Sequence, residues 1–170
     1  MLEFKHRELF PYKFWQGEDI VRVYLDNCCY NRPFDNQNFL RISLETQAKL
    51  YIQKLIRDKK VELATSYMLR FENSKNPFET KRQTIENFCR SNRIVHIDAS
   101  RAAAVRQEAA EMIKNGVKAK DACHVASAIL AGCDYFISTD DKLLKHKSEK
   151  ITMLNPVDFI RICEVSDNDN

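Results

Sequence analysis

The chain has 170 residues, 44% of them hydrophobic, which is enough for one domain with a substantial core. With only 3 glycines, 4 prolines and no repeat, the composition excludes a fibrous protein and a chain with a long flexible linker. The net charge of +3 is too small to indicate nucleic-acid binding by itself, and no apolar run approaches the roughly 18 residues that span a bilayer, so we expect a soluble, cytoplasmic protein.

The first two thirds of the chain alternate between strand and helix patterns, after an N-terminal extension over residues 1–19 whose packing the sequence does not determine. Runs of β-branched and aromatic residues predict strands at 20–26, 61–65 and 93–98. Apolar residues at helical spacing predict helices over 37–60, 66–72, 79–91 and 100–115. Ser66 is placed to cap the second of these helices, and Gly116 to end the fourth.

The last third repeats the alternation in shorter elements. A small-residue helix is predicted over 121–132, a strand over 134–139, a short helix over 140–147 and a strand over 151–154. Pro156 suits the first turn of a final helix. We predict a single domain over 20–163, followed by a disordered tail at 164–170.

Strands separated by helices of this length predict an α/β fold, a doubly wound and mainly parallel sheet with helices on both faces. In such sheets the loops that follow the strands lie along one edge, and ligands bind there, where the strand order reverses. Residues at the carboxyl ends of strands are therefore the first candidates for a functional site.

Acidic residues collect at that predicted edge. Asp26 ends the first strand, Asp140 and Asp141 end the fourth, Asp121 opens the helix before the fourth, and Glu72 lies in the helix after the second. If the first and fourth strands are neighbours, these carboxylates converge, and their repulsion requires a cation; an all-oxygen site suits Mg²⁺ or Mn²⁺. Each acid also has a structural alternative, as a turn former at Asp26, a helix cap at Asp121 or Asp140, and a solvated helix residue at Glu72.

Three segments resemble the PIN domain, a metal-dependent ribonuclease family that includes the VapC-type toxins of toxin–antitoxin modules. They are VYLDNCCYNRPFD, KAKDACHVASAILAGCDYFISTDDKLL and NPVDFI, in the expected order over residues 21–163. The resemblance implies catalytic, metal-binding acids at Asp26, Glu72, Asp121 and Asp141. Asp140 stands at a position that varies in the family, and Asn27 stands where the family more often has a different polar neighbour of the first acid. The 20-residue leader is unusual for the family.

The implied activity is Mg²⁺- or Mn²⁺-dependent hydrolysis of RNA phosphodiester bonds by an endoribonuclease, the toxin component of a toxin–antitoxin module, with an antitoxin or a second copy as partner. His124, one turn beyond Asp121, is a hydrogen-bonding partner of the site, a metal ligand or general acid, or a packed core residue. Ser138 and Thr139 either orient the acid at Asp141 or cap the helix that follows.

Basic residues near the same edge either hold RNA phosphates or form a solvated surface; they are Arg32, Lys118, Lys120, Lys142, Lys145 and Lys147. The six cysteines include no CxxC pair, and we expect most of them to be buried thiols. Two other functions stay open. One is a catalytically silent RNA-binding or scaffold module. The other is a phospho-receiver or phosphatase, which the late acidic doublet and the absence of a lysine after the last strand disfavour.

Overall fold

In the computed structural model, the structure describes residues 20–165; the predicted N-terminal extension and most of the predicted tail lie outside that range. Five strands form one parallel sheet in the order β3-β2-β1-β4-β5. They are β1 (Val21–Leu25), β2 (Val61–Ser66), β3 (Arg93–Ile97), β4 (Tyr135–Ile137) and β5 (Thr152–Leu154). Each strand lies where the sequence predicts one, and the predicted parallel sheet is confirmed.

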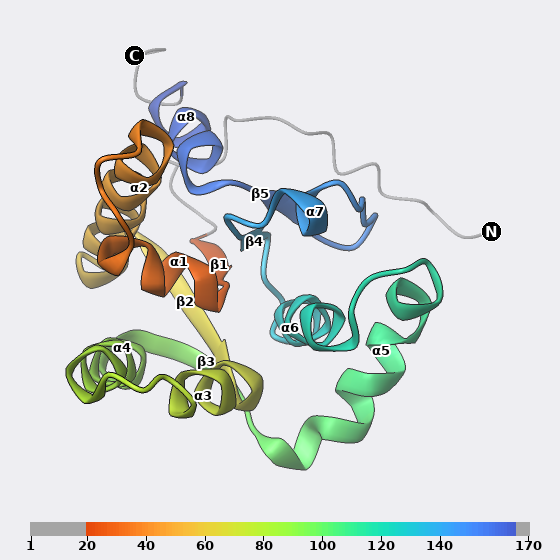
Figure 1. Cartoon of the computed structure of the whole chain (residues 1–170). Coiled ribbons are helices and arrows are strands. Elements are labelled where there is room, and N and C mark those ends of the chain that lie inside the picture. The colour runs from red at the N-terminus through yellow and green to blue at the C-terminus, as the bar shows by residue number, and fades with distance from the viewer. Residues whose placement is uncertain (1–19, 166–170) are drawn as a thin grey trace.

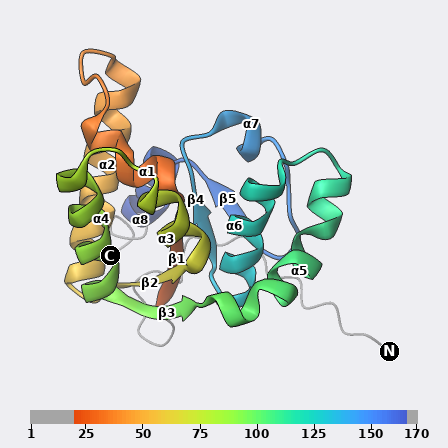
Figure 2. The same cartoon turned by 60° about the horizontal axis from the view of Figure 1, so that its bottom comes forward.

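Helices cover both faces of this sheet (Figure 1). The helices are α1 (Asn27–Asn31), α2 (Leu40–Arg57), α3 (Tyr67–Ser74), α4 (Glu79–Asn92), α5 (Ala102–Lys114), α6 (Ala119–Leu130), α7 (Asp141–Leu144) and α8 (Pro156–Val165). Short 3₁₀ turns precede α2 and α5, at η2 (Arg32–Phe34) and η3 (Ala99–Arg101). Helices α2, α4 and α8 lie on one side and α5 and α6 on the other, which confirms the doubly wound arrangement (Figures 1 and 2).

Most elements begin or end a few residues from the predicted bounds, and three differences concern the acids or the end of the domain. The segment after Asp26, for which no helix was predicted, is the short helix α1, because the Asp26 carboxylate accepts a hydrogen bond from the backbone of Asn27 and caps that helix. Helix α6 begins at Ala119, so Asp121 lies in its first turn and does not open it. Helix α8 extends to Val165, two residues beyond the predicted end of the domain.

The core lies on both sides of the central strand β1, whose inner residues are fully buried. Tyr24 of β1 stacks on Phe136 of β4, with ring centroids 5.6 Å apart. Five of the six cysteines are buried, Cys28 is half-buried, and all six are free thiols, as the sequence predicts. None of the helices in the described part of the chain is long and apolar enough to cross a membrane.

The strand order reverses between β1 and β4, at the centre of the sheet. The two strands pair in register, with Leu25 opposite Ile137, and the backbone N–H of Asp26 donates to the carbonyl of Ile137 at 2.9 Å. The carboxyl ends of β1 and β4 are therefore level. Residues that follow the two strands are brought side by side at the position where doubly wound sheets bind ligands.

Candidate metal centre

Asp26 is buried at the strand-order reversal, and its carboxylate is held from three directions. One oxygen, Oδ1, accepts from the backbone N–H of Asn27 at 2.7 Å, and Oδ2 accepts from the Ser138 hydroxyl at 2.8 Å. The Cys28 thiol lies 3.4 Å from the same Oδ2. The side chain is 8% exposed. These bonds fix the direction in which the carboxylate points, and they come from α1 and from the residue that follows β4.

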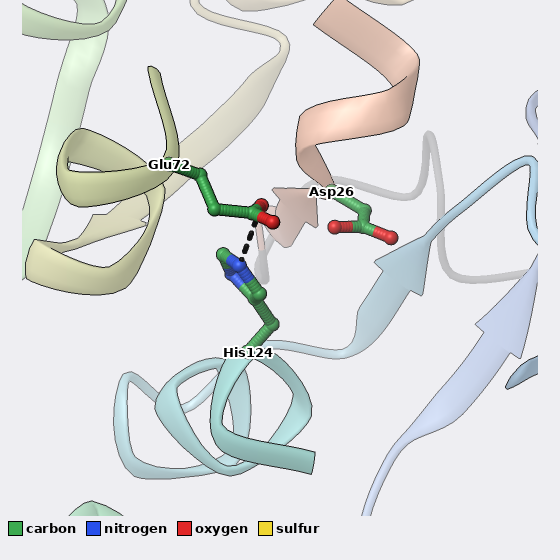
Figure 3. Close-up of side chains that lie close together, drawn as sticks. All are labelled: Asp26, Glu72 and His124. Carbon is green, nitrogen blue, oxygen red and sulfur yellow. Dashed lines mark hydrogen bonds and ion pairs between the residues drawn. The ribbon is translucent and has the colours of Figure 1, made fainter. Parts of the chain in front are cut away.

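A chain of buried hydrogen bonds positions Glu72, which α3 carries to the same edge. The Leu69 N–H donates to Ser66 Oγ, the Ser66 and Tyr24 hydroxyls lie 2.6 Å apart, and Tyr24 Oη lies 2.7 Å from His124 Nδ1. His124 Nε2 lies 2.9 Å from Glu72 Oε2 (Figure 3). Because an ionised carboxylate only accepts hydrogen bonds, Nε2 must carry a hydrogen, and this N–H group donates a hydrogen bond to Glu72. With a neutral imidazole, every group in this chain is satisfied.

The Glu72 carboxylate stays ionised although it is partly buried. Burial acts to raise its pKa, but hydrogen bonds from His124 and Lys120 outweigh that effect and bring the pKa to about 2. The Lys120 ammonium contacts Glu72 Oε1 in an ion pair, and its own pKa is raised by that bond. Glu72 therefore presents a full negative charge beside Asp26 near neutral pH.

Ligand atoms from Asp26, Glu72 and His124 all lie within 4.8 Å of one another. Figure 3 shows the three side chains converging from β1, α3 and α6. With Nε2 of His124 protonated toward Glu72, the carboxylates are the atoms available to a cation, and this oxygen-rich set suits a hard divalent ion. The side-chain oxygen of Asn27, next to Asp26, is buried and has no hydrogen-bond partner among the described residues, so a further acceptor at this edge lacks a donor.

Asp121 is half-buried in the first turn of α6 and has no hydrogen-bond partner among the described residues. Burial raises its pKa, and the charges of Asp26 and Asp140 raise it further, against the opposing charges of Lys120 and His124. The Asp121 carboxylate is thus close enough to Asp26 to be repelled by it. A bound cation relieves this kind of repulsion, and an unpaired carboxylate is free to bind one.

Asp141 points elsewhere. Its exposed carboxylate forms a two-pronged ion pair with Arg41 of α2, with distances of 2.6 and 2.7 Å, and this bond lowers its pKa. Asp141 is not part of the cluster that Asp26 forms with Glu72 and His124. Asp140 caps α7, because its carboxylate accepts from the backbone N–H of Lys142 at 2.9 Å. The structural alternative for Asp140 is therefore observed.

The remaining candidates are spread around the edge. Asn27 opens α1, and the buried Thr139 donates its backbone N–H to the Cys28 thiol at 3.3 Å. Arg32 is held in ion pairs with two carboxylates. Lys118 and Lys142 are exposed at the starts of α6 and α7. Arg32 and Lys120 are held in ion pairs, whereas Lys118 and Lys142 are exposed and form no ion pair with the described residues.

Sequence reasoning missed three contributors to the site. Tyr24 was assigned to a strand alone, although a buried tyrosine hydroxyl must find a partner, and that signal was present two residues before Asp26. Ser138 was a candidate to orient Asp141 or to cap the helix that follows, but its hydroxyl donates to Asp26. Arg41 lies 100 residues from Asp141 in the chain, on the exposed face of a long helix, and nothing in the sequence pattern marks it.

No family model and no curated protein matches the sequence. Among solved structures, the fold is similar to a chain of VapBC2 from Rickettsia felis, which was solved bound to a DNA fragment from its promoter. The TM-score is 0.51 at 15% identity, and the matched region covers 79% of the present chain and 98% of the VapBC2 chain. The likeness is one of fold. FitAcB from Neisseria gonorrhoeae gives a TM-score of 0.49 at 17% identity, covering 79% of this chain and 97% of that chain. The five-stranded parallel α/β architecture is thus shared with the VapBC2 chain.

Proposed function

We propose that this protein is a Mg²⁺- or Mn²⁺-dependent endoribonuclease and the toxin component of a toxin–antitoxin module. The observation that carries the proposal is the convergence of Asp26 and Glu72 at the strand-order reversal, with the unpaired Asp121 beside them. The shared fold with a VapBC2 chain and the resemblance to PIN-domain motifs support it.

In the proposed reaction, Asp26, Glu72 and Asp121 hold the divalent ion. When bound, such an ion supplies a water of lowered pKa for attack on the phosphodiester and offsets the charge that develops on the leaving oxygen. The chain itself keeps the ligands in place. Ser138 fixes the carboxylate of Asp26, and His124 fixes that of Glu72, so neither has to reorganise when substrate binds.

A partner protein and an RNA substrate belong to the same proposal. VapBC2, whose chain has the same fold, was solved bound to a DNA fragment from its promoter. By analogy, we propose an antitoxin partner for this chain. Lys118 and Lys142, exposed near the acids, are the residues we assign to the phosphates of bound RNA.

A catalytically silent RNA-binding module is the second candidate, and one observation favours it. Two of the four predicted acids are already neutralised by cations of the chain, Glu72 by Lys120 and Asp141 by Arg41. A site whose charges are balanced by its own residues has less need of a metal ion. This candidate predicts RNA binding that does not depend on divalent ions and is not followed by cleavage.

Metal binding and cleavage should be measured on the same preparations. Calorimetric titration with Mn²⁺ and incubation with labelled RNA, with and without chelator, are expected to show binding and chelator-sensitive cleavage. Asp26→Asn should abolish both. The matched control is Asp158→Asn, which removes an aspartate on the exposed surface of α8, and it should change neither. RNA binding without Mn²⁺ uptake, unaffected by Asp26→Asn, would instead support the silent module.

The toxin role has a separate test in cells. Expression of the wild-type chain is expected to arrest bacterial growth, and expression of Asp121→Asn to an equal level is not. Equal growth inhibition by both chains would contradict a toxic activity based on hydrolysis. Comparable levels and solubility of the two proteins should be verified by immunoblot of the soluble fraction.

A further inference from the structure

A second polar site lies beside α3, the helix that carries Glu72. It is a pocket of about 270 Å³ between α3, α4 and the ends of β2 and β3. Figure 2 shows α3 and α4 running beside these two strands. None of the charged residues of the metal centre lines this pocket. Ser66 does line it, and the Ser66 hydroxyl also bonds to Tyr24 in the hydrogen-bond chain of the metal centre.

The pocket has an excess of positive charge. Arg70, Arg90 and Arg93 line it, and the one carboxylate in its lining, Glu86, pairs with Arg90 at 2.8 Å. Within residues 20–165, neither Arg70 nor Arg93 is paired with a carboxylate. The charges act on His96 at the pocket wall, whose pKa is lowered first by burial and then by Arg93 and Arg70, with Asp98 opposing. Two guanidinium groups thus face this cavity without a counter-charge, which is the arrangement that binds phosphate.

The same pocket contains a buried acceptor without a donor. Asn73 is 5% exposed and lines the pocket, and its Nδ2 donates to the carbonyl of Arg82 at 2.9 Å. Its Oδ1 has no hydrogen-bond partner within residues 20–165. An orphaned buried oxygen is costly, so an N–H donor that reached it would gain affinity. The buried side chains of Leu69 and Ile85 add an apolar part to the lining.

We propose that this pocket binds one ribonucleotide unit, with its phosphate on Arg70 and Arg93, its base against Leu69 and Ile85, and a base N–H group donating to Asn73 Oδ1. Phosphate, an apolar ring and an N–H donor occur together in a nucleotide, and not in inorganic phosphate or a sugar phosphate. The unit is either a free nucleotide or one residue of a single-stranded RNA. The proposal rests on the pocket alone and not on hydrolysis at Asp26.

The test is calorimetric titration of the full chain with each of the four ribonucleoside 5′-monophosphates, with ribose 5-phosphate and with inorganic phosphate. At least one nucleotide is expected to bind with a dissociation constant below about 1 mM. Arg70→Gln combined with Arg93→Gln should weaken it by about tenfold or more. Arg161→Gln, which removes an exposed arginine on α8, is the matched control and should leave it unchanged. No binding, or equal binding of ribose 5-phosphate or phosphate, overturns the proposal.

Two further experiments distinguish a free nucleotide from RNA as the ligand, and the pocket from the metal centre as the binding site. Displacement of the bound nucleotide by a single-stranded oligoribonucleotide points to substrate RNA as the occupant, and failure to displace it points to a free nucleotide. Asp26→Asn is expected to bind the nucleotide as the wild type does, whereas the double arginine variant is expected to retain Mn²⁺ uptake. Loss of nucleotide binding in Asp26→Asn would show that the ligand sits at the acids, and would overturn the assignment to this pocket.

Discussion

The arrangement of the metal centre can be tested by removing one atom, the hydroxyl oxygen of Tyr24. It bridges Ser66 Oγ at 2.6 Å and His124 Nδ1 at 2.7 Å, and burial holds its pKa well above the ordinary value, so it remains a donor. In Tyr24→Phe, Ser66 keeps its bond from the Leu69 N–H, but Nδ1 of His124 loses its partner. Because His124 is 1% exposed, water does not replace that partner readily.

One buried, unsatisfied nitrogen costs about 1–3 kcal/mol. For a chain of this size each kcal/mol lowers the melting temperature by about 2–4 °C, so Tyr24→Phe should melt about 2–12 °C lower than the wild type. The His124 ring also loses the bond that fixes its orientation toward Glu72. We therefore expect weaker Mn²⁺ uptake, by about tenfold.

Tyr30→Phe is the matched control, because Tyr30 is fully buried too. Its hydroxyl lies near the Cys89 thiol, a weak partner at best, and no nitrogen or oxygen of the described residues bonds to it. Urea and thermal denaturation of both variants, with chelator present, give the comparison, followed by Mn²⁺ titration. Tyr30→Phe should be close to neutral. If Tyr24→Phe loses no more stability than Tyr30→Phe, the hydrogen-bond chain does not position the site.

Three further predictions concern charge. Burial lowers the pKa of Lys49 from 10.5 to about 8, so the charged ammonium destabilises the folded state at pH 7. Lys49→Met should therefore raise the free energy of unfolding at pH 7 by about 3 kcal/mol. In urea denaturation, this gain in stability should disappear as the pH rises from 8 to 10.5. The pKa of Glu72 is about 2, below its ordinary 4.5, so Glu72→Gln should lower the free energy of unfolding at pH 7 when a chelator is present. In the same assay, this loss of stability should become smaller as the pH falls from 4.5 toward 2. A loss that does not change with pH would contradict the role of the ion pair. Arg41→Gln frees Asp141, so Mn²⁺ titration should show tighter binding if Asp141 joins the site, and an unchanged affinity would assign Asp141 to a structural ion pair.

The elements were predictable because each has a local cause. The β-branched run before Asp26 fits a strand buried on both faces, and the Ser66 hydroxyl caps α3 as its position predicts. The helix α1 was missed because five residues are too few to show a helical period, and the Asp26 cap is what begins it. The acid cluster depends on β1 and β4 being neighbours. The sequence does not determine that pairing, and the structure shows it.

The side-chain partners inside the site were not predictable in the same way. Glu72 and His124 are 52 residues apart, and their bond depends on how α3 and α6 pack across the edge of the sheet. Asp141 stands in a segment that resembles a PIN-domain motif, yet Arg41 of α2 pairs with its carboxylate. Such contacts depend on distances of a few ångströms between elements, whereas periodicity and spacing specify only which elements form.

The sequence by itself therefore determined the alternation of strands and helices, the parallel sheet, and the set of acids that reach its carboxyl edge, since backbone propensity and hydrophobic period act within each segment. Only the tertiary structure decided which acids share a site. Packing of α3 and α6 against each other and against β2 brings Glu72 and His124 to Asp26. The same packing leaves Asp121 unpaired and gives Asp141 to Arg41, because the energy of a carboxylate depends on the charges and donors within a few ångströms of it.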